Sequence, residues 1–285
     1  MTGLDRRLNL FRPDLADVRL RGRVQAERYG TGDPASVIAP VADVKSAPDA
    51  AAGMDTQLLL GDAVDVFERR NGWAWVQARR DRYVGYVAET ALGSPAAEPT
   101  HQVAVPRTFA YPEPDMKRPV TRCLSMGSRF REIGRAETRG LAYSRTEAGD
   151  WVVLPHLEPV GATPPATDFV AVAESLLHTP YLWGGTSGFG IDCSGLVQLS
   201  LRMAGHDVVR DTDMQEADLG ERIGQADLRR GDLVFWKGHV AIMLDGSMMI
   251  HANGHTMTTA LEPLAAAILR ISYLYGQPTA FKRVI

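Results

Sequence analysis

The 285-residue sequence contains only two cysteines, Cys123 and Cys193, and no long run of apolar residues. Two cysteines cannot form a disulfide framework, and a reactive thiol survives best in a reducing compartment. No segment approaches the roughly 18 to 20 apolar residues that a transmembrane helix needs. The first 23 residues mix arginines and aspartates through their apolar residues, so they lack the apolar core of a signal peptide. These absences predict a cytoplasmic protein with no membrane partner.

An excess of positive charge is also absent. The chain has 31 Lys and Arg against 34 Asp and Glu, a formal net charge of −3, and its basic residues form only short pairs. Such a distribution gives no electrostatic footprint for nucleic acid, so we expect no nucleic-acid partner. The composition, with 45% hydrophobic and 23% charged residues, is that of a globular protein. Its length predicts two or three domains but does not indicate an oligomeric state.

The N-terminal half is rich in short segments that are typical of β-strands. Residues 1–34 carry no pattern to which we can assign a role. Residues 35–95 alternate apolar segments with turn residues and predict a small antiparallel barrel, with one strand at Val37–Val41 and a tight hairpin at Asn71–Gly72. A linker follows, and residues 100–160 repeat the pattern, with a strand at Arg129–Ile133.

The C-terminal part, residues 164–285, has helical patterns first and strand patterns afterwards. A Pro-rich boundary at Thr163–Ala166 precedes a helix that Asp168 caps and that ends near Leu177. A second helix begins at Cys193. Three strands follow, at Asp232–Trp236, His239–Leu244 and Met248–Ala252, and they predict an α+β unit with an antiparallel sheet.

Cys193 lies where a glycine-rich run ends and apolar residues at helical spacing begin. Asp192 can cap this helix, and Gly205 can end it. The partial positive charge at a helix N-terminus lowers the pKa of a cysteine, and the thiolate is the form that attacks carbonyl groups. A lone cysteine is nevertheless more often structural than catalytic, so its partners must decide its role.

Two histidines supply the partners. A loop of three residues at Asp245–Ser247 would pair Ile242 with Ile250 and place His239 and His251 on the same face of the hairpin. Neighbouring imidazoles suit a base and the residue that orients it. We therefore predict Cys193 as nucleophile, His239 as general base and His251 as the orienting third member.

Zinc binding is the other chemistry open to these side chains. Cys193, His239, His251 and His255 are all of metal-ligand type. Their spacing matches no standard structural zinc motif, so we expect neither a metal nor another cofactor.

Five short segments of residues 165–285, in order, resemble the motifs of the NlpC-type papain-like cysteine peptidases. They are Tyr181–Gly185, Asp192–Leu196, Arg230–Phe235, His239–Met243 and Ile250–Ala252. Residues 35–95 are similar to a bacterial SH3-like domain, most clearly at Thr56–Asp62 and Asp81–Val87, and residues 100–160 resemble another. The resemblance implies an α+β chain in which two small SH3-like β-barrels precede a papain-like catalytic domain.

The resemblance also implies an activity. It is that of a cysteine endopeptidase that hydrolyses the γ-D-glutamyl to diamino-acid bond of peptidoglycan-derived peptides. The expected partner is a muropeptide, L-Ala-γ-D-Glu-diamino acid, with a free N-terminal L-Ala, as in cell-wall recycling. Diaminopimelate and lysine stay open as the diamino acid. Two alternatives also stay open: an acyltransferase or amidase on the same scaffold, and an inert protein that binds wall fragments.

The same resemblance implies roles for individual residues. Tyr181 is expected near the oxyanion, and Asp192 and Ser194 are expected to contact the substrate. Asp62 and Tyr83 of the first SH3-like domain lie in its gating segments. A buried ammonium group needs a carboxylate and further acceptors, so we expect Asp192, Asp62 and Tyr83 to hold the free amine of L-Ala.

Overall fold

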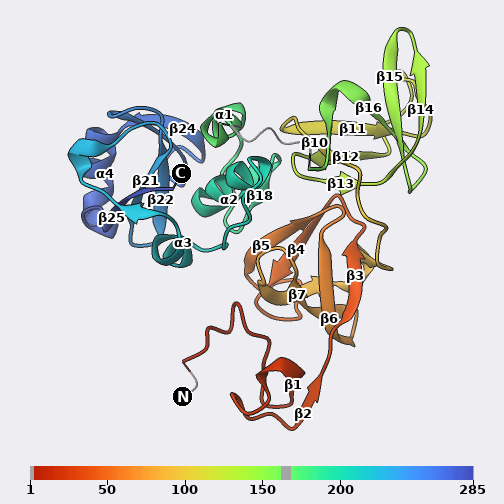
Figure 1. The fold of residues 1–285 in the computed structure, drawn as a ribbon, viewed down its shortest axis with the longest axis horizontal. Coiled ribbons are helices and arrows are strands. Elements are labelled where there is room, and N and C mark those ends of the chain that lie inside the picture. Colours follow the sequence, from red (N-terminus) through yellow and green to blue (C-terminus); the bar gives the residue numbers. More distant parts are fainter. Residues whose placement is uncertain (1–2, 162–167, 285) are drawn as a thin grey trace. The chain divides into compact units, whose positions relative to one another are not determined.

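The computed structural model describes residues 3–161 and 168–284, and the chain divides into two compact units, residues 1–160 and 161–285 (Figure 1). The domain boundary expected at Thr163–Ala166 lies outside the described residues. Within those residues, no helix is long and apolar enough to cross a membrane.

The first unit begins with a segment that packs on a seven-stranded sheet. Leu10 and Leu15 form a small apolar cluster with Trp75. The guanidinium of Arg12 lies 4.1 Å from the centroid of the Trp75 ring and donates a hydrogen bond to the hydroxyl of Tyr86. The N-terminal segment, to which we could assign no role from the sequence, therefore packs on the sheet. Its elements are β1 (Leu15–Asp17), a 3₁₀ turn (Val18–Leu20) and β2 (Arg28–Gly30).

The seven strands follow the order β5-β4-β8-β7-β6-β3-β9 around a core of small aliphatic residues. The hairpin at Asn71–Gly72 is confirmed, since both residues have positive φ, 53° and 79°. The single strand expected at Val37–Val41 is wrong. Pro40 has no N–H for a ladder, and the amide of Ile38 bonds to Ala91 instead. The strands are β3 (Asp33–Val37), β4 (Val41–Lys45), β5 (Met54–Leu59), β6 (Ala63–Arg70), β7 (Trp73–Ala78), β8 (Val84–Ala88) and β9 (Leu92–Gly93).

The rest of the first unit contains a three-stranded sheet, β13-β10-β17, and a five-stranded sheet, β12-β11-β16-β15-β14. The strand expected at Arg129–Ile133 is two strands, because the segment changes sheets at Arg131. Phe130 pairs with His101, whereas Glu132 pairs with Thr146. The strands are β10 (His101–Val103), β11 (Arg107–Tyr111), β12 (Arg122–Ser125), β13 (Arg129–Phe130), β14 (Glu132–Thr138), β15 (Leu141–Thr146), β16 (Trp151–Val153) and β17 (Leu157–Pro159).

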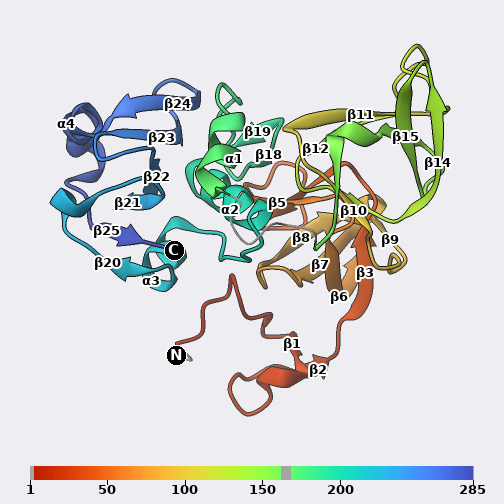
Figure 2. The same ribbon diagram turned by 45° about the horizontal axis from the view of Figure 1, so that its top comes forward.

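In the second unit, the first two helices precede the strands of the main sheet along the chain, as the sequence predicts. This sheet is antiparallel and has six strands in the order β20-β25-β21-β22-β23-β24 (Figure 2). Two further helices and the outer strands were not predicted. The helices are α1 (Phe169–Ser175), α2 (Cys193–Met203), α3 (Thr212–Asp218) and α4 (Leu264–Tyr275). The strands are β18 (Thr186–Ser187), β19 (Gly190–Ile191), β20 (Glu221–Arg222), β21 (Asp232–Trp236), β22 (His239–Met243), β23 (Met248–Asn253), β24 (Thr258–Pro263) and β25 (Ala280–Arg283).

The register of the β22–β23 hairpin matches the prediction, because Ile242 pairs with Ile250. The face of the hairpin that carries the histidines is buried. Ala241, Met243 and Met249 on that face are buried in one cluster with Leu264, Ala267 and Ile271 of α4. Helix α2 packs against β22 and β23, and Figures 1 and 2 show it across the sheet from α4. The central strands are therefore buried on both faces.

Candidate active site

Cys193 is the first residue of α2, and Asp192 caps this helix as predicted. Asp192 has an extended backbone, with ψ near 180°, and its Oδ1 accepts a hydrogen bond from the amide of Gly195 at 2.7 Å. Replacing Gly195 with any larger residue would cause a steric clash, because a Cβ there would lie 2.2 Å from the carbonyl oxygen of Gly185. The chain thus holds the cysteine at a fixed helix start.

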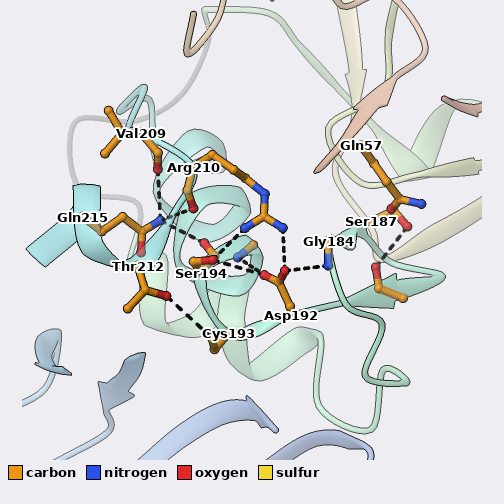
Figure 3. Close-up of polar contacts among 12 residues, drawn as sticks. Gln57, Gly184, Ser187, Asp192, Cys193, Ser194, Val209, Arg210, Thr212 and Gln215 are labelled. Carbon is orange, nitrogen blue, oxygen red and sulfur yellow. Dashed lines mark hydrogen bonds and ion pairs between the residues drawn. The ribbon is translucent and has the colours of Figure 1, made fainter. Parts of the chain in front are cut away.

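A buried polar network surrounds the cap (Figure 3). Arg210, which is 1% exposed, lies 2.6 Å from Oδ2 of Asp192 and donates to the hydroxyl of Ser194 at 2.6 Å. Gly184 donates its amide to the same carboxylate at 2.9 Å. The side-chain amide of Gln215 donates to the carbonyl of Ser194 at 3.0 Å. Asp192 and Ser194 are therefore held rigidly next to Cys193, and the sequence did not predict Arg210 or Gln215 as their partners.

Cys193 is 7% exposed, and its Sγ lies 3.8 Å from the hydroxyl of Thr212. Burial, with a smaller contribution from the negative charge of Asp192, raises the pKa of Cys193 to about 11. The expectation that the helix N-terminus lowers this pKa is wrong. The cap supplies a carboxylate at the helix end, and the loss of solvation on burial disfavours the charged thiolate. Cys193 is a neutral thiol at neutral pH.

The two histidines are in direct contact. Nε2 of His239 lies 2.9 Å from Nδ1 of His251, with the rings inclined at 67°. Burial, followed by the nearby charges of His251 and Arg270, lowers the pKa of His239 to about 3. A neutral imidazole can accept a proton, and its Nδ1 is the nitrogen that the contact with His251 does not use. The pairing predicted from the hairpin register is thus present.

A cavity of about 460 Å³ brings the thiol and the base together. Cys193, His239 and Tyr181 all line it. Burial, together with the charges of Cys193 and Asp192, raises the pKa of Tyr181, so its hydroxyl keeps its proton. The remaining lining residues are Trp183, Gly238, Asn253, Gly254, His255, Arg270, Ile271, Tyr273, Leu274 and Tyr275.

The zinc alternative finds no support in this geometry. Nitrogens of His239 and His251 face each other at hydrogen-bond distance, instead of converging on a common point. Over residues 3–161 and 168–284, no group of three or more His, Cys, Asp or Glu side chains could hold a metal ion.

Asp62 and Tyr83, both expected at the substrate, belong to the first unit and are buried there. Oδ2 of Asp62 accepts hydrogen bonds from the amide of Leu59 at 2.9 Å and from Arg80 at 3.0 Å. The backbone amide of Tyr83 donates to Asp81 at 3.0 Å. Arg80 therefore balances the charge of Asp62, which the sequence did not indicate. The contact of both residues with a substrate amine stays a prediction.

Comparison with known proteins supports this chemistry. Residues 178–274 match the NlpC/P60 family, and residues 44–92 match the bacterial dipeptidyl-peptidase Sh3 domain. The second unit is an NlpC/P60 domain, and the chain is a cysteine peptidase. The Bacillus cereus gamma-D-glutamyl-L-lysine dipeptidyl-peptidase is 28% identical over 240 residues, which span 74% of this chain and 71% of that protein.

Two further similar proteins cover most of the length of this chain. Dipeptidyl-peptidase 6 of Lysinibacillus sphaericus is 27% identical over 240 residues, which span 77% of this chain and 87% of that protein. The crystal structure of an NlpC/P60 family protein from Bacillus cereus superposes with a TM-score of 0.74 at 22% identity. It covers 88% of this chain and 99% of that one. The fold is therefore papain-like with an N-terminal SH3-like domain, as the resemblance implied, whereas the second SH3-like domain at residues 100–160 stays a prediction.

The protonated state of the thiol can be tested by alkylation. Because only the thiolate reacts, inactivation by iodoacetamide should accelerate about tenfold per pH unit from about pH 6 to about pH 9, without reaching a plateau. The measurement uses Cys123→Ala, which removes the exposed second thiol. A rate that is constant over this range would instead reveal a preformed thiolate. It would contradict the conclusion that Cys193 and His239 are both neutral at neutral pH.

Proposed function

We propose that this chain is a cysteine endopeptidase that hydrolyses the γ-D-glutamyl to diamino-acid bond of peptidoglycan-derived peptides with a free N-terminal L-Ala. The proposal rests on the cavity that Cys193 and His239 line together. The ring of His239 is hydrogen-bonded to His251. The names of two relatives, gamma-D-glutamyl-L-lysine dipeptidyl-peptidase and dipeptidyl-peptidase 6, support the substrate class. A role in cytoplasmic cell-wall recycling is part of the proposal.

The chemistry follows from the two neutral groups. As Sγ of Cys193 attacks the γ-carbonyl carbon of D-Glu, Nδ1 of His239 takes the thiol proton, because neither group is charged at rest. His239 then returns this proton to the leaving amine of the diamino acid, and a thioester remains. A water molecule that His239 deprotonates hydrolyses the thioester and releases L-Ala-D-Glu, and His239 returns the proton to Sγ of Cys193. We assign Tyr181 to the side of the cavity where the oxyanion forms.

The proposed specificity rests on the free amine of L-Ala. Asp192, Ser194, Asp62 and Tyr83 are the residues that we assign to the substrate. Asp192 already pairs with Arg210, so its carboxylate is held in place before any ligand binds. An N-acylated peptide has no ammonium group, so it leaves these buried polar groups without a ligand. Sites of this kind reject the wrong substrate strongly.

The proposal is tested by comparing the free tripeptide with its N-acetyl form. We expect kcat/KM to be higher for the free peptide by roughly 100-fold or more, because the N-acetyl form leaves the polar groups that bind the ammonium without their ligand. Asp62→Asn and Tyr83→Phe should reduce this ratio.

Asp65→Asn is the matched control, because Asp65 forms an ion pair with Arg79 in the same unit but has no assigned substrate role. Equal cleavage of both peptides by the wild type would remove the free-amine requirement. An unchanged ratio in Asp62→Asn and Tyr83→Phe would remove those two residues from the site.

Acyl transfer is a second candidate, and the rim of the cavity favours it. Trp183, Tyr273 and Leu274 line the cavity and are 71%, 79% and 61% exposed. Such an apolar rim could receive an amine or lipid acceptor in place of water. Mass spectrometry of the reaction with an added amine acceptor separates the two activities, since transfer yields an N-acylated acceptor and hydrolysis yields the free acid.

A further inference from the structure

Glu262 lies next to the histidine pair and has no role in the mechanism described so far. It is on β24 opposite Met249, so its side chain shares a sheet face with His251. Nε2 of His251 is buried without a well-aligned hydrogen bond among the described residues, and it lies 3.2 Å from Oε2 of Glu262. Cys193, His239, His251 and Glu262 thus come from α2 and from the three neighbouring strands β22, β23 and β24.

Arg270 of α4 holds this carboxylate in place. Its Nε donates to Oε1 of Glu262 at 2.9 Å, and its Nη2 donates to Oε2 at 2.5 Å. Burial raises the pKa of Glu262, but the contacts with His251 and Arg270 outweigh it and bring the pKa to about 2. The carboxylate that faces His251 is therefore ionised at neutral pH.

We propose that Glu262 is a positioning residue that sets the tautomers of both histidines and so makes Nδ1 of His239 the proton acceptor. An anionic oxygen 3.2 Å from Nε2 of His251 favours a proton on that nitrogen. Nδ1 of His251 then carries a lone pair and accepts the proton that Nε2 of His239 donates. Nδ1 of His239 is left unprotonated, as a general base must be.

The reverse arrangement is unproductive. If Nδ1 of His251 carried the proton, Nε2 of His239 would accept it, and Nδ1 of His239 would carry the other proton. A neutral imidazole that is protonated at Nδ1 cannot take the proton of Cys193 there. The carboxylate therefore selects between two hydrogen-bond directions along the same pair of rings, and neither ring has to move.

The test replaces Glu262 with glutamine, which keeps the side chain's shape but offers His251 a donor as well as an acceptor. In the wild type, ¹⁵N spectra of the imidazoles should show both rings protonated at Nε2. In Glu262→Gln, both rings should shift toward the Nδ1-protonated form. For the proposed tripeptide substrate, kcat should fall by about 10-fold to 100-fold with KM little changed, as for other residues that orient an active group.

Three variants separate this role from a structural one. Glu174→Gln removes an ion pair with Arg230 of similar length in the same unit, and it should change neither the tautomers nor kcat. If Glu262→Gln fails to fold because Arg270 loses its partner, the double variant Glu262→Gln, Arg270→Gln should fold and show the same tautomer shift. Arg270→Gln alone keeps the carboxylate and should keep the wild-type tautomers.

Wild-type tautomers in the folded variants that lack the carboxylate would overturn the proposal. So would a wild-type enzyme with His239 protonated at Nδ1. The spectra need no substrate, so they decide on Glu262 even if the proposed peptidase substrate is wrong. Failure of the tripeptide assay with the expected spectra would count against the substrate and not against Glu262.

Discussion

Cys193→Ala should abolish cleavage of the tripeptide, with a loss in kcat of roughly 10⁵-fold to 10⁶-fold, the scale seen when a catalytic nucleophile is removed. The fold should survive. The capping bond of Asp192 goes to the amide of Gly195, and alanine is a good helix former. The variant removes one sulfur atom from a site that faces a cavity, so little packing is lost.

Cys123→Ala is the matched control. Cys123 is exposed on β12 of the first unit, so its removal should leave kcat and KM near their wild-type values. Thermal unfolding of both variants shows whether each is folded. A folded Cys193→Ala protein with near wild-type turnover would mean that the thiol is not the nucleophile.

Arg210→Met should cause the largest loss of stability, about 3–5 kcal/mol in the free energy of unfolding, because it leaves a buried carboxylate without its cation. Arg210 is 1% exposed and is the ion-pair partner of Asp192. It also donates to Ser194, so the substitution removes two hydrogen bonds from the start of α2. Urea denaturation of the whole chain measures the loss.

Two further variants show whether the loss comes from the unpaired charge. Asn is a good cap, so the double variant Arg210→Met, Asp192→Asn should recover much of the stability and reveal a coupling between the two positions. Arg222→Met removes an exposed ion pair with Glu216 and should cost less than about 1 kcal/mol. Equal losses in Arg210→Met and Arg222→Met would contradict the account of the buried network.

Local patterns were enough to predict the parts of the site that lie close together in the chain. The cap at Asp192, the helix of Cys193 and the hairpin that aligns His239 with His251 all follow from residue spacing over one or two elements. The strand breaks at Pro40 and Arg131 were missed. The apolar residues continue past them, and only the change of hydrogen-bond partner reveals the break.

The charged partners could not be predicted in the same way. Arg210, Glu262 and Arg270 look like ordinary surface residues in the sequence, and they become important only through contacts that tertiary packing creates. Helix α4 shows the same limit, because its apolar residues do not reveal which sheet face they cover. The pKa of Cys193 is raised, although we expected it to be lowered, for the same reason. The sequence shows where the helix begins but not that its first residue is buried.

The most direct test of the account is the identity of the bond that is cut. The purified protein is incubated with L-Ala-γ-D-Glu-diamino acid tripeptides that contain either diaminopimelate or lysine, and the products are identified by mass spectrometry. We expect L-Ala-D-Glu and the free diamino acid from at least one tripeptide with the wild type, and neither product with Cys193→Ala. Release of free L-Ala, or both tripeptides left intact by the folded wild type, would contradict it.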